Sequence, residues 1–340
     1  MRELQHTVQD KSIKEMDLLP ENALKLQVFD VTDKVMDRVY QKGQQKPGPT
    51  AKMRLRPGIA VPAMITFFVL GASITGYAAS QYLEFRNSKG DILLHTAKFY
   101  EPSDSVKKYL QVLDTYSQKV KNQLQLGEYA AYYVKDDFIN NEDRLNPVKF
   151  EYKWVEFSSF SSFQKEIKRT HAPLLYSPSH LPDGYHFDYG YVYPAFMYPK
   201  SLNNAEYRTL VDELIQKSKS APAGEKMFIK KLNWKKADLT TARYVKGSNY
   251  VSISISTLTP ESKLTIFQND RDSAEKLTIK GTEAYYIGSS ETKQPTNTSK
   301  NRLGWKDDNH HLFYEIYDNP NSPLVKQDLV KIAEDLLAPH

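Results

Sequence analysis

Residues 57–83 read PGIAVPAMITFFVLGASITGYAASQYL, and no charged residue lies between Arg56 and Glu84. A helix of about 20 apolar residues crosses the hydrocarbon core of a bilayer, and only a helix satisfies the backbone of a single crossing segment. We therefore predict one transmembrane helix over Pro57–Leu83. A buried core helix is less favoured at this length, and a cleaved secretory signal is disfavoured because a long polar segment precedes the stretch.

Basic residues gather only on the N-terminal side of this stretch. They are Lys42, Lys46, Lys52, Arg54 and Arg56, with no acidic residue among them. On the C-terminal side, basic and acidic residues balance within a few positions. Because cytoplasmic flanks carry the excess of Lys and Arg, we predict that residues 1–56 are a cytoplasmic tail and that residues 84–340 lie outside the cell membrane.

The length, net charge and composition of the whole chain narrow the class of protein further. The chain has 340 residues, a net charge of +5 and 40% hydrophobic residues, which supports a packed core outside the membrane. The modest charge gives no reason to predict direct binding to nucleic acid. The sequence contains no cysteine, which excludes disulfides, thiolate zinc sites and cysteine nucleophiles.

The tail carries one amphipathic pattern. Residues 30–43 read DVTDKVMDRVYQKG, with Asp or Thr available as a helix cap and glycine at the end. The apolar stripe of this helix consists of Val35, Met36, Val39 and Tyr40. A lone short helix is marginal in water, so we expect the stripe to pack in the groove of a partner protein. Adsorption to lipid headgroups is the alternative.

Short motifs precede the linker and the span, namely Asp30-Val31-Thr32, Val35-Met36 and Arg38-Val39. In this order they resemble the inner segment of membrane-anchored anti-sigma-factor-like proteins of Gram-positive, spore-forming bacteria. The resemblance implies that residues 1–56 hold a cytoplasmic sigma factor or a similar regulator. The chain departs from the best-known anti-sigma class, because that class uses a zinc site that contains cysteine.

The first extracytoplasmic region, residues 84–157, is expected to begin with a linker and a long amphipathic helix. Ser103 or Asp104 caps this helix, which we expect to pack on an adjacent sheet rather than to form a dimeric seam. Strands are predicted over Glu128–Val134 and Val148–Phe157.

The second extracytoplasmic region, residues 158–340, alternates strands with turns. Helices are predicted near residues 161–170 and 204–219 and from Ser322 to the C-terminus. The predicted strands are Tyr250–Leu258, Leu264–Gln268, Lys276–Lys280, Ala284–Ser289, Arg302–Lys306 and His311–Tyr317. Closely spaced strands imply an antiparallel meander. The predicted fold class is α+β: a single transmembrane helix plus an extracytoplasmic region of antiparallel sheet packed by a few helices.

One predicted strand is rich in tyrosine. Because side chains alternate along a strand, five aromatic residues should share one face. They are Tyr185, Phe187, Tyr189, Tyr191 and Tyr193. Such a row either packs beneath helices, which we favour, or forms a stacking platform for sugar rings or a peptide. The candidate ligand-binding residues are Tyr185, Tyr189, Tyr191 and Tyr193.

The C-terminal region carries several motifs in a fixed order. They are Leu181-Pro182-Asp183-Gly184-Tyr185, Lys280-Gly281-Thr282-Glu283-Ala284, Leu303-Gly304-Trp305 with Tyr314, and Ile332-Ala333-Glu334-Asp335-Leu336. This order resembles the uncharacterised C-terminal domain that follows a single span in many Gram-positive anti-sigma-like and envelope proteins. The resemblance implies an architecture and a cellular context, and it supplies no site residues.

No catalytic, metal-binding or cofactor-binding motif is recognisable in the sequence. Residues 307–311 read DDNHH, which we interpret as a hairpin turn because neighbouring side chains on a strand point to opposite faces. We therefore predict no catalytic residues, no metal and no cofactor, and we do not expect an enzyme.

The sequence leaves two functions open. In the first, the outer domain senses an envelope condition and the tail helix holds a regulator. In the second, the chain is an anchored binding module for a glycan, peptide or lipid, and the tail has no regulatory role. A ladder of small residues, Ala72, Gly76 and Ser80, also suggests that the span pairs with a second copy to form a homodimer.

Overall fold

The computed structural model describes residues 82–338, apart from residues 88, 145, 196–204, 260–261 and 290–298. The predicted tail helix, the predicted span up to residue 81 and the homodimer ladder lie outside the described residues. The predicted end of the span at Leu83 is wrong, because residues 82 and 83 are not helical and Leu83 packs in the core beside β1. In the part of the chain that is described, no helix is both long enough and apolar enough to cross a bilayer. The described part is mixed α+β with mostly antiparallel sheets and few helices, as predicted.

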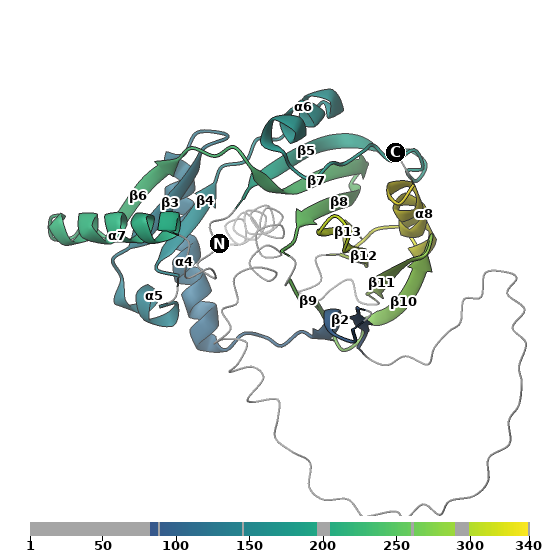
Figure 1. The fold of residues 1–340 in the computed structure, drawn as a ribbon, viewed down its shortest axis with the longest axis horizontal. Coiled ribbons are helices and arrows are strands. Elements are labelled where there is room, and N and C mark those ends of the chain that lie inside the picture. The colour runs from purple at the N-terminus through teal and green to yellow at the C-terminus, as the bar shows by residue number, and fades with distance from the viewer. Residues whose placement is uncertain are drawn as a thin grey trace, which may run out of the picture. The chain divides into compact units, whose positions relative to one another are not determined.

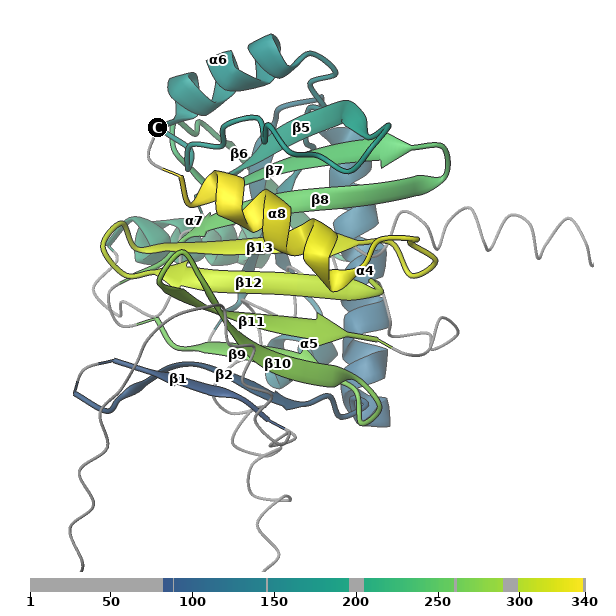
Figure 2. The same ribbon diagram turned by 90° about the vertical axis from the view of Figure 1, so that its right-hand side faces the viewer.

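The largest element is a seven-stranded sheet in the order β10-β11-β12-β13-β8-β7-β5, and each neighbouring pair is antiparallel. Its strands are β5 (His186–Pro194), β7 (Ala237–Lys246), β8 (Asn249–Thr257), β10 (Ser273–Ile279), β11 (Thr282–Gly288), β12 (Asn301–Asp307) and β13 (Leu312–Asp318). Figure 2 shows this sheet with two helices on one side, α6 (Phe160–Thr170) and α8 (Lys326–Leu336).

The helices cover the apolar face of this sheet. In β8, Val251, Ile253 and Ile255 are fully buried on that side, as their alternation predicted. They pack in one core with Trp305 of β12 and Ile332 of α8. Alternation then places Ser252, Ser254 and Ser256 on the opposite face.

A second sheet has the order β4-β3-β6, and a helical layer covers each of its faces. Its strands are β3 (Tyr129–Val134), β4 (Val148–Tyr152) and β6 (Met227–Leu232). One face packs on α4 (Asp104–Gln123) and α5 (Asp137–Glu142), and the other packs on α7 (Ala205–Ser220). Figure 1 shows α7 and α4 beside these strands.

This sheet crosses the predicted boundary at residues 157 and 158. β6 and α7 come from the second predicted region, yet β6 pairs with β3 and α7 packs on the same sheet. The two predicted regions therefore do not correspond to separate packing units. The physical reason lies in β3, because its residues are buried on both faces and it needs a central position with a neighbour on either side.

A third sheet joins β1 (Glu84–Arg86), β2 (Ile92–Lys98) and β9 (Leu264–Gln268). β2 pairs with β9 in parallel, an exception to the antiparallel pattern that we predicted. The predicted linker after residue 83 is therefore wrong. Apolar side chains of this sheet pack against Tyr285, Ile287 and Phe313 on the second face of the seven-stranded sheet.

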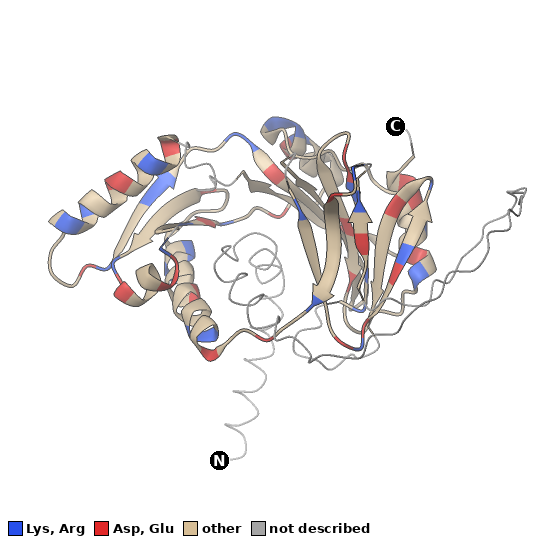
Figure 3. Cartoon of the chain, turned by 60° about the horizontal axis from the view of Figure 1, so that its bottom comes forward, with Lys and Arg blue, Asp and Glu red and all other residues tan. Residues whose placement is uncertain are grey.

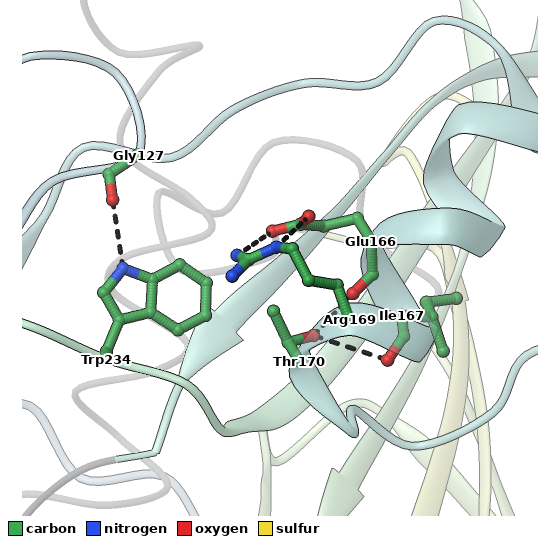
Figure 4. Close-up of polar contacts among 6 residues, drawn as sticks. All are labelled: Gly127, Glu166, Ile167, Arg169, Thr170 and Trp234. Atoms are coloured by element: carbon green, nitrogen blue, oxygen red, sulfur yellow. Dashed lines mark hydrogen bonds and ion pairs between the residues drawn. The ribbon is translucent and has the colours of Figure 1, made fainter.

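An aromatic cluster joins the β4-β3-β6 sheet to the seven-stranded sheet. Trp234, between β6 and β7, donates from Nε1 to the carbonyl oxygen of Gly127 at 3.0 Å. Figure 4 shows the guanidinium of Arg169 between this indole ring and the carboxylate of Glu166. Tyr152 contacts both Trp234 and Tyr193, with ring centroids 5.3 and 5.2 Å away. This cluster is therefore a packed contact between the two sheets.

Candidate binding face

The face of the seven-stranded sheet opposite α6 and α8, called here the polar face, carries polar and aromatic side chains. The register aligns one row across β5, β7, β8, β13 and β12, which consists of Tyr189, Arg243, Ser252, Tyr317 and Arg302. The next row consists of Tyr191, Thr241, Ser254, Glu315, Gly304 and Tyr285. An antiparallel sheet needs only one apolar face against helices, so the second face is able to carry polar groups.

The tyrosine strand does not present its aromatic residues on one face. In β5 the register shifts between Phe187 and Tyr189, so Asp188 is an extra residue and the alternation reverses. Phe187 packs on the helix-covered side, while Tyr189 and the tyrosines after it face the other way. Tyr185 precedes the strand and is buried in the helix-covered core. The predicted common face is therefore wrong for Tyr185 and Phe187.

The remaining tyrosines of this strand differ in their surroundings. Tyr191 is only 2% exposed and stacks on Trp154, with centroids 5.6 Å apart. Tyr193 is buried beside Tyr152. Tyr189 is half-buried and lies next to Arg243, at 5.7 Å from the guanidinium carbon to the ring centroid. Packing thus accounts for Tyr191 and Tyr193, and a ligand-binding role for the four candidate tyrosines stays a prediction.

A buried network occupies the β12 side of the polar face. Tyr285 donates its hydroxyl to Glu315 Oε1 at 2.7 Å, and Arg302 Nε lies 3.4 Å from the same oxygen. Burial, and then the nearby charge of Glu315, raise the pKa of Tyr285 well above its usual value. Tyr285 therefore keeps its proton and remains a donor, which satisfies the buried carboxylate of Glu315.

The β7 side of the polar face also contains buried polar atoms without a hydrogen-bond partner, as does the β12 side at Arg302 Nε. Arg243 Nε lies 3.7 Å from Asp188 Oδ2, beyond hydrogen-bond distance, and the Arg243 guanidinium carbon lies 4.2 Å from the ring centroid of Tyr250. Arg243 Nε and Ser252 Oγ are both buried atoms without a hydrogen-bond partner. Buried polar groups are nearly always paired, so this pair marks a candidate functional site.

Sequence reasoning missed Arg243 and Ser252. A signal was present, because Arg243 interrupts a run of strand-forming residues between Ala242 and Tyr244. The register that places Arg243 opposite Ser252 depends on the β7–β8 pairing, and β7 itself was not predicted.

The other sequence motifs take structural positions. Residues 307–311 contain the turn between β12 and β13, as predicted, and His310 Nδ1 lies 2.7 Å from Asp307 Oδ2. In the described ranges, no group of three or more His, Asp or Glu side chains is placed to hold a metal ion. Figure 3 shows acidic and basic residues interspersed along α4 and α7.

No protein-family model, curated protein or solved structure matches this chain. The candidate site therefore rests on the geometry of the described residues alone.

Proposed function

We propose that this chain is a single-pass membrane signalling protein of the anti-sigma-factor-like kind. Its outer domain binds a ligand of the cell envelope on the polar face, and its cytoplasmic tail holds a sigma factor or a similar regulator through Val35, Met36, Val39 and Tyr40. One observation carries this proposal: the apolar stretch that we predict to cross the membrane ends inside the packed core of the outer domain.

The connection at this point is rigid. Leu83 and Phe85 are 9% and 8% exposed, and they pack with Leu94 and Ile266. The amide of Leu83 donates to Thr96 Oγ1 at 2.8 Å, and the amide of Thr96 donates to the carbonyl oxygen of Leu83 at 2.9 Å. A protein that is merely tethered works equally well on a flexible linker, whereas a signal that passes along the chain needs this stiffness.

The same sheet connects Leu83 to the polar face. β2 pairs with β9, which lies between β8 and β10 in the chain. The apolar side of the sheet packs on Tyr285, whose hydroxyl bonds Glu315 on the polar face. A ligand that shifts these strands would therefore move the segment that continues into the predicted span.

An insertion tests this coupling. Placing Gly-Gly-Ser-Gly between Ser80 and Gln81 should leave the outer domain folded, because the insertion precedes β1. It should abolish signalling, because a flexible segment of this kind transmits little displacement. The measurement is the transcript profile of the source organism, and the insertion strain should match a strain that lacks the protein.

The matched control inserts the same four residues after Gly247, in the exposed turn between β7 and β8. This variant should retain the wild-type transcript profile. If the insertion after Ser80 also leaves the profile at the wild-type level, rigid coupling is refuted.

The polar face also favours the second function, an anchored binding module for a glycan, peptide or lipid without a regulatory tail. That function predicts that deletion of residues 1–50 leaves the envelope phenotype unchanged. Signalling predicts that the same deletion reproduces the phenotype of a strain without the protein.

A further inference from the structure

We infer that the outer domain docks on the headgroup layer of the bilayer from which the chain emerges. The contact surface, called here the juxtamembrane collar, consists of Tyr82, Lys98, Phe99, Tyr100 and Phe267. The inference rests on the proposed function, in which the chain crosses the membrane before it enters the outer domain. It adds a second partner to that function, namely the surface of the lipid bilayer itself.

The first step concerns the length of chain between the predicted span and the folded domain. A helix of about 20 residues crosses the hydrocarbon core, and residues 62–81 supply this length without a charged residue. Leu83 is already packed in the core, so only Tyr82 separates the two. The headgroup layer is about 5–7 Å thick on each side, whereas one extended residue spans at most about 3.6 Å. Tyr82 therefore lies within the headgroup layer.

The second step identifies the groups that lie beside Tyr82. Leu83 is hydrogen-bonded to β2, so Tyr82 lies next to the end of that strand. Its hydroxyl interacts electrostatically with Asp270, Lys98 and Tyr100. Lys98 Nζ lies 2.5 Å from Asp270 Oδ2 and 5.5 Å from the ring centroid of Tyr100. When Tyr82 lies in the headgroup layer, these neighbouring groups lie against the same layer.

The third step concerns the residue types in the collar. The side chain of Tyr100 is 59% exposed. Phe99 and Phe267 are half-buried and contact each other edge to face, with ring centroids 6.4 Å apart. Tyrosine is enriched where membrane meets water, because its ring suits the apolar side and its hydroxyl suits the polar side. A lysine such as Lys98 covers apolar groups with its alkyl chain and keeps its ammonium in water. This composition is that of an interfacial belt.

The fourth step separates this contact from electrostatic binding to anionic lipid. Lys98 is paired with Asp270, and Arg86 of β1 is paired with Glu84 at 2.5 Å. Attraction to anionic lipids requires clustered basic residues, and these two are each balanced by a carboxylate. The aromatic rings therefore drive the contact, and zwitterionic phosphatidylcholine suffices as the partner.

Helix α4 supplies a reference position that lies far from the collar. It begins at Asp104, shortly after Tyr100, and its 20 residues extend about 30 Å. Leu126 follows its far end and is 69% exposed. Leu126 is thus an exposed apolar residue like Tyr100, but it is separated from the collar by the length of the helix.

The test is fluorescence quenching of the purified full-length chain in phosphatidylcholine nanodiscs, in which part of the lipid carries a nitroxide on its headgroup. The chain has no cysteine, so Glu101→Cys labelled with bimane places a single probe beside Tyr100. The side chain of Glu101 is 75% exposed, so the label does not disturb the core. This probe should lose fluorescence to the nitroxide, whereas the same probe at Leu126→Cys should not. Replacing part of the phosphatidylcholine by phosphatidylglycerol should leave both results unchanged.

Matched variants test the role of the exposed ring. Tyr100→Ser, made in the Glu101→Cys chain, should reduce the loss of fluorescence because the ring no longer enters the headgroup layer. Tyr176→Ser removes another exposed tyrosine, outside the collar, and should leave the loss of fluorescence unchanged. Circular dichroism should show the same fold for both variants, since exposed side chains contribute little to the core.

Four results would overturn the docking: no quenching at position 101, equal quenching at positions 101 and 126, quenching only in the presence of phosphatidylglycerol, or wild-type quenching after Tyr100→Ser. A probe at Phe68→Cys, in the predicted span, separates such a result from failure of the proposed function. If acyl-chain nitroxides quench the probe at position 68 while the probe at position 101 stays bright, only the docking is refuted. If neither probe is quenched, the predicted span and the proposed function are refuted as well.

Discussion

Replacing Lys149 by methionine is expected to lower the free energy of unfolding of the outer domain by about 3–5 kcal/mol. Lys149 on β4 pairs with Asp143, and their side chains are only 7% and 8% exposed. Lys149 also donates to the carbonyl oxygen of Asn146 at 2.6 Å. The substitution leaves the carboxylate of Asp143 buried without its counter-charge, and this penalty rather than lost attraction dominates the effect. Urea denaturation followed by circular dichroism measures the change.

An exposed ion pair on the same sheet provides the control. Lys230 on β6 pairs with Glu213 of α7, and both side chains are 41% or more exposed. Lys230→Met should therefore cost less than about 1 kcal/mol. Combining Lys149→Met with Asp143→Asn should restore part of the lost stability, because no buried charge remains. Equal losses for Lys149→Met and Lys230→Met would contradict this account of the buried pair.

Replacing Asp318 by alanine is expected to lower the free energy of unfolding by about 3–5 kcal/mol, because several buried donors lose their acceptor at once. Asp318 is 0% exposed at the end of β13. Its carboxylate accepts from the amides of Lys300 and Asn301 at 3.0 and 2.7 Å and from Asn301 Nδ2 at 2.6 Å. These hydrogen bonds connect the start of β12 to the end of β13.

Asp307 provides the matched control for Asp318. It lies at the other end of the same hairpin, accepts from the amides of Asn309 and His310, and has a side chain that is 26% exposed. Water can replace these partners, so Asp307→Ala should cost about 1 kcal/mol or less. Thermal unfolding of the two variants side by side measures the difference, and a larger loss for Asp307→Ala would refute the importance of the buried bonds.

We also expect the contribution of Asp318 to the free energy of unfolding to depend on pH. Burial raises the pKa of Asp318 above its ordinary value of 3.8, although its hydrogen bonds oppose the shift. The folded state therefore holds this proton more tightly than the unfolded state does. Its contribution to stability is complete below pH 3.8 and is lost as the pH rises through the raised pKa. The difference in unfolding free energy between wild type and Asp318→Ala should therefore grow as the pH is lowered through that range.

Local sequence patterns, such as side-chain alternation and helix caps, correctly predicted helices and strands that pack against elements close to them in the sequence. The alternation in β8 predicted both the strand and its buried face, and of the two predicted caps, Ser103 and Asp104, Ser103 is the N-cap of α4. In contrast, β6 and β7 were missed. Lysines interrupt β6. Thr241 and Arg243 make β7 polar on one face and Thr240 adds a polar residue on the other, so neither strand shows an apolar run.

The errors in arrangement have non-local causes. The β-bulge at Asp188 reverses the side-chain alternation, and no residue type in that strand announces it. β1 has three residues, too few for a periodic pattern, and it is stabilised by β2 and the core beneath it. The start of α8 was placed too early at Ser322, because the loop before Lys326 is held by side-chain bonds instead of helical turns.

The candidate site was likewise predicted only where local sequence patterns suffice. The sequence identified tyrosines on β5, but the chemistry on the polar face comes from Arg243 and Ser252, which meet only through the β7–β8 register. Tyr189 is the predicted residue that lies beside them. The site could not be predicted from the sequence, because it depends on which strands pair. That pairing is set by packing across the whole sheet.

The proposed signalling function depends on the prediction that the apolar stretch beginning at Pro57 crosses the cell membrane before the chain enters the packed core at Leu83. The chain contains no cysteine, so single cysteines report topology without interference. Lys219→Cys places a thiol at an exposed position on α7, and Lys42→Cys places one in the tail. Intact cells are treated with a membrane-impermeant maleimide. We predict labelling of Cys at position 219 in intact cells and at position 42 only after lysis, whereas labelling of position 42 in intact cells, or protection of position 219 until lysis, would contradict the proposed signalling function.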